Sequence, residues 1–120
     1  MEKIKIPRIV RKNFRLEINV SEKLCEAVYQ EYKRFLILKN LAAEDTVIIP
    51  SYFIKIAWDY HIYETKAYAR FCNAVFGKFL HSLNLALEPV KEEVQDYGKT
   101  LQLYEYVFRI TPVEQLWPPP

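Results

Sequence analysis

Four side chains in the middle of the chain have the chemistry of metal ligands or of a catalytic group: Asp59, His61, Cys72 and His81. Imidazole and carboxylate suit zinc or iron, and a cysteine with a histidine and an orienting acid is the set that nucleophilic catalysis requires. Their spacing argues against both kinds of site. Asp59 and His61 are two positions apart, so a helix would point them about 200° away from each other. Lys55, one helical turn earlier, is placed to form an ion pair with Asp59 and would repel a nearby cation.

We therefore predict a protein with no catalytic residue, no metal-ligand set and no cofactor. A metal-dependent enzyme or metal-binding protein that uses Asp59, His61, Cys72 and His81 is the alternative. Cys72 belongs to an apolar helical stripe, where thiols are usually inert packing groups. For Cys25 and Cys72, the two cysteines of the chain, we expect buried thiols rather than a disulfide, because no secretory signal peptide is recognisable.

Four helices are expected to position these residues. Apolar side chains recur at steps of three and four, the helical period, over about residues 22–40, 52–63, 66–76 and 89–108. Ser21 is suited to cap the first helix, and Gly77 to end the third in the left-handed conformation. The chain holds only two glycines, too few for the frequent turns of a β-sandwich or for a Gly-rich phosphate loop.

The two ends of the chain differ from this helical middle. Apolar residues alternate loosely over residues 1–20, and the first fifteen positions hold six of the 17 basic groups, so we expect an extended basic arm. Residues 111–120 hold four of the seven prolines, and we expect this tail to pack on the domain through Trp117. The predicted fold is all-α: a compact bundle of about four to five helices over residues 21–110, with an extended N-terminal arm and a Pro-rich C-terminal tail.

A series of spaced residues runs from Pro50 to Trp117. It comprises Pro50-Ser51, Trp58, His61, Thr65, Tyr68, Cys72, Phe76-Gly77, His81, Thr100, Tyr104, Phe108, Pro112 and Trp117-Pro118. This pattern resembles the glycine-rich-domain-containing-protein-like family, a domain of largely uncharacterised function. The departures are Lys55 for the family's aspartate, Asp59 for a histidine, Ser82 for a second histidine and Arg109 for a glycine. The resemblance implies a degenerate member whose ancestral polar site is dismantled.

Aromatic content favours a surface that binds other proteins. Nine tyrosines and two tryptophans exceed what one core needs, and both residue types are enriched at interfaces. The residues predicted to contact a partner are Tyr52, Phe53, Tyr60, Tyr63, Tyr68 and Arg70. We expect a non-catalytic protein–protein interaction module that regulates or inhibits a partner enzyme. The chain is similar in size and composition to small inhibitors that intracellular bacterial pathogens encode beside effector enzymes, including ubiquitin-modifying ones. A twofold homodimer is expected on the same grounds.

Charge and hydropathy bear on whether the chain binds nucleic acid, enters a membrane or is secreted. The net charge of +2 is small for a general nucleic-acid binder, so nucleic-acid binding through the basic N-terminal arm is the third alternative. No apolar run approaches the ~18 residues that a membrane helix needs. Basic residues interrupt the N-terminal stretch throughout, which is not the pattern of a secretory signal. We expect a cytoplasmic protein without membrane partners, and leave export by an unmarked route open.

Overall fold

The computed structural model describes residues 4–43, 45–83 and 90–120. The described residues form five helices: α1 (Arg8–Ile18), α2 (Glu22–Leu41), α3 (Tyr52–Tyr63), α4 (Thr65–Phe76) and α5 (Lys91–Phe108). No strand occurs among the described residues, so the predicted all-α class and the number of helices are confirmed. The predicted start of the last helix at residue 89 lies outside the described residues.

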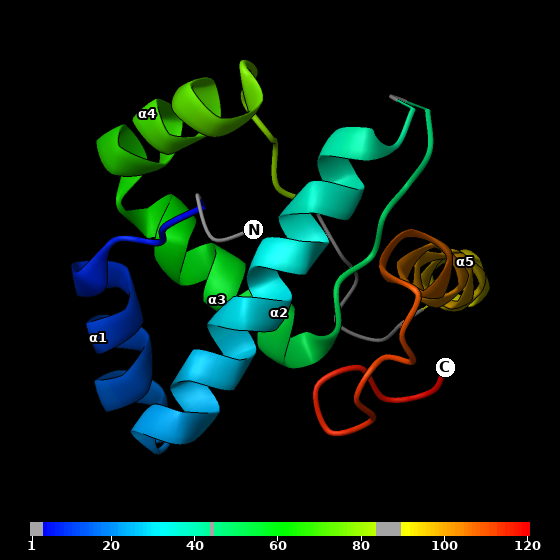
Figure 1. The fold of residues 1–120 in the computed structure, drawn as a ribbon, viewed down its shortest axis with the longest axis horizontal. Coiled ribbons are helices and arrows are strands. Elements are labelled where there is room, and N and C mark those ends of the chain that lie inside the picture. The colour runs from blue at the N-terminus through cyan, green and yellow to red at the C-terminus, as the bar shows by residue number, and fades with distance from the viewer. Residues whose placement is uncertain (1–3, 44, 84–89) are drawn as a thin grey trace.

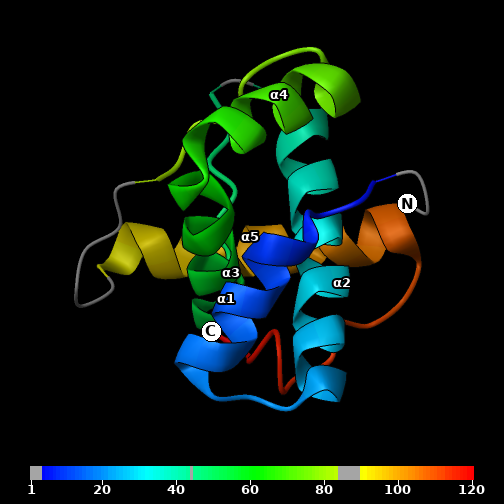
Figure 2. The same ribbon diagram turned by 90° about the vertical axis from the view of Figure 1, so that its left-hand side faces the viewer.

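Helix α2 is the centre of the arrangement. Helices α1 and α3 pack against it and against each other, and α4 follows α3 at one end (Figure 1). Helix α5 contacts α2 from the side opposite α1 and crosses the other helices at a steep angle, as Figure 2 shows. The chain after α5 turns back beneath that helix towards the middle of the bundle (Figure 1).

The prediction of an extended N-terminal arm over residues 1–20 is wrong for most of that range, because Arg8–Ile18 forms helix α1. Val10 and Phe14, four positions apart, are completely buried and define the inner face of this helix. The alternating pattern depended on Leu16, which is 55% exposed. Helical spacing of the buried residues therefore outweighs the alternation, and only residues 4–7 precede the helix without regular structure.

Local signals set the ends of the helices. Ser21 accepts a hydrogen bond through Oγ from the Leu24 amide at 3.1 Å, as predicted for a cap of α2. Gly77 ends α4 with φ of 70°, a conformation that costs glycine little. The core between these helices is rich in aromatic residues: Tyr32 and Trp58 are among its completely buried side chains.

Candidate functional site

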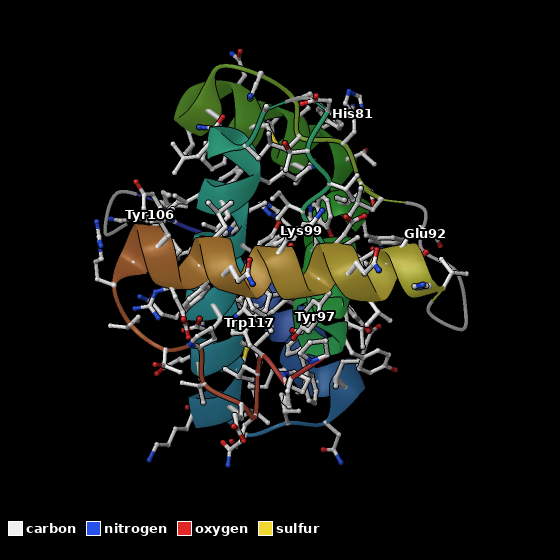
Figure 3. The ribbon with its side chains drawn as sticks, turned by 90° about the vertical axis from the view of Figure 1, so that its right-hand side faces the viewer. His81, Glu92, Tyr97, Lys99, Tyr106 and Trp117 are labelled. Carbon is white, nitrogen blue, oxygen red and sulfur yellow. The ribbon has the colours of Figure 1, made fainter. Side chains whose placement is uncertain are left out.

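The four side chains with metal or catalytic chemistry do not converge. His61 and Cys72 are completely buried, whereas the Asp59 side chain is 53% exposed and forms the predicted ion pair with Lys55. His81 is exposed and lies at the edge of the molecule, away from α5 (Figure 3). Within the described part of the chain, no three histidine, cysteine or acidic residues gather as metal ligands would.

His61 lies in an aromatic pocket of the core. Its Nδ1 atom is 2.8 Å from the hydroxyl of Tyr32, and the rings of Tyr68 and Phe71 lie edge-on at centroid distances of 4.9 and 4.7 Å. Among the described residues, Nε2 has no hydrogen-bond partner. Burial lowers the pKa of His61 to about 4, so the imidazole is neutral at pH 7 and closed to solvent.

Tyr68 joins three segments of the fold around that histidine. Trp58 donates through Nε1 to the Tyr68 hydroxyl at 2.9 Å, and this hydroxyl donates to the Leu80 carbonyl at 2.5 Å. Tyr68 is only 1% exposed. The prediction that Tyr68 contacts a partner is therefore wrong. Its ring is buried in the core, and its hydroxyl links α3 and α4 to the chain that follows α4.

A buried carboxylate forms a second polar cluster, which sequence reasoning missed. Glu31 is 5% exposed. Its Oε1 accepts hydrogen bonds from the Tyr104 hydroxyl at 2.5 Å and from Trp117 Nε1 at 3.0 Å. Its Oε2 pairs with Arg34 Nη1 at 2.7 Å. We call Glu31, Arg34, Tyr104 and Trp117 the Glu31 cluster. A signal was present, since Glu31 falls three positions after Val28 on the buried stripe of α2.

The Glu31 cluster holds the C-terminal tail in place. Trp117 is 2% exposed and lies beside Tyr97 under α5 (Figure 3), with the two rings stacked at 6.4 Å. The Arg34 guanidinium donates to the Tyr104 hydroxyl at 2.9 Å as well as to Glu31. Burial, followed by the hydrogen bond to Glu31, raises the pKa of Tyr104 to about 12. The tail thus joins α2 and α5 through hydrogen bonds inside the core.

The remaining residues predicted to bind a partner do not form a single patch. Tyr52 and Tyr63 are 77% and 80% exposed, but they stand at opposite ends of α3, about 16 Å apart along its axis. Phe53 and Tyr60 are partly buried against the core. Arg70 is exposed on α4. The exposed rings of Tyr52 and Tyr63 are therefore separate surface features.

Basic side chains gather instead along a groove between α1 and α2. Two hollows of about 340 and 220 Å³ share Arg11 and Glu26 in their linings, so they adjoin each other at these two residues. We call the two adjoining hollows together the α1–α2 groove. Its cationic residues are Lys5, Arg8, Arg11, Lys12, Arg15 and Lys33. Sequence reasoning noticed most of these charges but assigned them to an extended arm, so it missed their common face.

Comparison with known proteins adds a family. The model of the UCP032817-like family, an uncharacterised family, matches residues 2–104, more than half of the chain. The chain belongs to this family. No curated protein and no solved structure matches the sequence. The predicted membership of the glycine-rich-domain-containing-protein-like family is therefore wrong.

Because the chain belongs to the UCP032817-like family, the residues that matched the other family's pattern have no functional role implied by that match. Several of them have a structural role instead. Thr100 accepts a hydrogen bond through Oγ1 from the Ile49 amide at 3.0 Å and donates to the Asp96 carbonyl at 2.9 Å. Thr65 begins α4 and Gly77 ends it. Across the described residues, no helix has the length and apolar character to cross a bilayer.

Proposed function

We propose that this member of the UCP032817-like family is a non-catalytic protein–protein interaction module that regulates or inhibits a partner enzyme. The observation that carries the proposal is the α1–α2 groove. It collects six cationic side chains at an accessible surface, where a partner can reach them. A concentration of one charge sign favours recognition of a surface of the opposite sign.

The positions of the reactive residues support the non-catalytic part of the proposal. A catalytic histidine must come within hydrogen-bond reach of a substrate, whereas His61 is completely buried among aromatic rings. Cys72 is completely buried as well, and a thiol in such surroundings is usually inert. Asp59 is exposed but already forms an ion pair with Lys55.

The exposed rings supply a second, weaker support. Tyr52 and Tyr63 offer apolar area with a polar hydroxyl at the surface, a combination that is enriched at interfaces. An effector enzyme of an intracellular bacterium is the partner class suggested by the sequence. We place the interaction in the cytoplasm, because both cysteines are free thiols, as is usual in a reducing compartment.

Affinity capture from a lysate of the native host, followed by reconstitution from purified proteins, tests the proposal. The expected result is one protein that binds stoichiometrically, as measured by light scattering, and whose activity falls when the chain is added. Metal analysis of the purified chain tests the metal-dependent alternative. One tightly bound zinc or iron per chain, lost in His61→Ala but kept in His81→Ala, would favour the metal-dependent alternative and overturn the proposal.

A further inference from the structure

The cations of α1 lie on one stripe of the helix. Arg8, Arg11, Lys12 and Arg15 follow one another at steps of three, one and three, which places them on a single face. The opposite face carries Val10, completely buried in the core. From Arg8 to Arg15 the stripe rises about 10 Å, the length of roughly three residues of an extended peptide.

The charge of the groove is out of proportion to that of the chain. Six cationic side chains and two carboxylates, Glu22 and Glu26, line the two hollows, which gives the groove a formal charge of +4. The whole chain carries +2, so all other residues together carry −2. The positive charge of the protein is therefore concentrated at this site.

Glu22 and Glu26 offset part of this charge, but no ion pair within the described part of the molecule holds any of the six cations. None of the six lies at ion-pair distance from a carboxylate within residues 4–43, 45–83 and 90–120. Burial, and then the neighbouring charges of Arg11 and Lys5, lower the pKa of Lys33. Folding thus brings like charges together at a cost in free energy, and a bound anionic group would offset that cost.

The lining of the groove favours a polypeptide over a nucleic acid. Ile6, Tyr29 and Gln30 line the larger hollow; Ile6 and Tyr29 are only 4% and 2% exposed, so the hollow combines a small apolar area with an amide. Glu22 and Glu26 would repel the regularly spaced phosphates of a nucleic acid. A peptide can place carboxylates at the cations, an apolar side chain near Ile6, and neutral or basic residues near the two glutamates.

We propose that the α1–α2 groove binds an extended acidic segment of a partner protein, with one apolar side chain of that segment seated in the larger hollow. This inference rests on the proposed interaction function and gives the chemistry of the partner. The acidic segment lies along α1, its carboxylates facing Arg8, Lys12 and Arg15.

Fluorescence anisotropy with a labelled synthetic peptide tests the occupant directly. The probe is a short peptide of aspartate and glutamate with one central leucine; its counterpart of asparagine and glutamine with the same leucine is the uncharged control. Single-stranded oligothymidylate and phosphatidylcholine vesicles containing phosphatidylserine are the competing probes. The acidic peptide is expected to bind more tightly than the other three. Tighter binding of the oligonucleotide or the vesicles would overturn the inference.

Two matched double variants locate the binding. Arg8→Glu with Lys12→Glu reverses two exposed groove charges, and Lys91→Glu with Lys99→Glu makes the same change of net charge on α5. Affinity for the acidic peptide is expected to fall about tenfold or more in the groove variant and less than about twofold in the α5 variant. Equal losses would mean a general charge effect and contradict the inference. Lys33→Gln, which removes one charge from the larger hollow, is expected to weaken binding severalfold without disturbing the fold.

The same two variants separate this inference from the proposed function. If a partner captured from the lysate binds both variants equally, the interaction function stands and the assignment of the groove is wrong. If the acidic peptide binds the groove but the wild-type chain captures no protein, the chemistry of the groove stands and the proposed function is wrong. Loss of the captured partner in the groove variant alone supports both.

Discussion

The Glu31 cluster and the α1–α2 groove use charge in opposite ways on the same helix. Glu31 and Lys33 are two positions apart on α2, so they point about 200° away from each other. Glu31 faces inward and receives hydrogen bonds from Tyr104 and Trp117 and an ion pair from Arg34. Lys33 lines a hollow beside other cations. A charged group that is buried with its hydrogen-bond partners fixes the path of the chain, whereas charged groups of one sign that gather at the surface without ion pairs are available to a ligand.

Removal of the Glu31 carboxylate gives the largest expected effect. Glu31→Ala leaves Arg34 and two buried donors without their acceptor, so we expect a loss of about 3–5 kcal/mol in the free energy of unfolding. Urea titration at neutral pH measures it. Glu26→Ala, an exposed position on the same helix, is the control and should change stability by less than about 0.5 kcal/mol. Similar losses of stability in both variants would show that the buried carboxylate of Glu31 contributes no more to the fold than the exposed carboxylate of Glu26.

Protonation of His61, a buried group with one hydrogen bond, is expected to have the next largest effect on the free energy of unfolding. Its pKa of about 4 lies below the ordinary value of 6.5 because of burial, so the unfolded chain binds the proton more readily. Stability is therefore complete above pH 6.5, falls as the pH drops towards 4, and loses about 3 kcal/mol in total.

Urea titrations across this pH range measure the loss. His61→Gln keeps a hydrogen-bonding group for Tyr32 but cannot titrate, so this part of the pH dependence should disappear. His81→Gln, a change at an exposed position, should leave it intact. A curve of unchanged shape in His61→Gln would show that other groups cause the acid sensitivity.

Removal of single donors to Glu31 is expected to have intermediate effects. Trp117→Phe and Tyr104→Phe each delete one hydrogen bond to the carboxylate, which is worth about 1.5–3 kcal/mol when the acceptor is charged. The double variant should depart from the sum of the two, because both donors share one oxygen. Tyr106→Phe on the exposed side of α5 is the control. Strict additivity would indicate that the two donors act independently.

The smallest effect has the opposite sign. Lys33→Gln relieves repulsion from Arg11 and Lys5, so the free energy of unfolding should rise by up to about 0.5 kcal/mol, with weaker binding of the acidic peptide. Lys23→Gln, at an exposed position of α2 that does not line the groove, should change neither quantity. A loss of stability in Lys33→Gln would mean that the lysine holds the fold together rather than serving a ligand.

The helical period was enough to predict most of the fold. Four helices follow from apolar side chains at steps of three and four, and Ser21 and Gly77 mark two of their ends. Helix α1 was missed because exposed apolar residues, Leu16 among them, mimic alternation. Exposure depends on which neighbours cover a helix, and that information is absent from a local pattern.

The missed helix also explains the missed groove. In an extended arm, Arg8, Arg11, Lys12 and Arg15 would point to different sides, whereas a helix collects them on one. The buried pair of Glu31 with Trp117 was out of reach for another reason, since the two residues are 86 positions apart. No helical or strand period connects such distant residues.

That separation has a consequence for how the protein is made. Translation at ~5–20 residues per second leaves about 4–17 s between the synthesis of Glu31 and that of Trp117, its partner 86 positions later. The Glu31 carboxylate therefore cannot reach its final buried surroundings before Trp117 has been synthesised, so this part of the core is completed late.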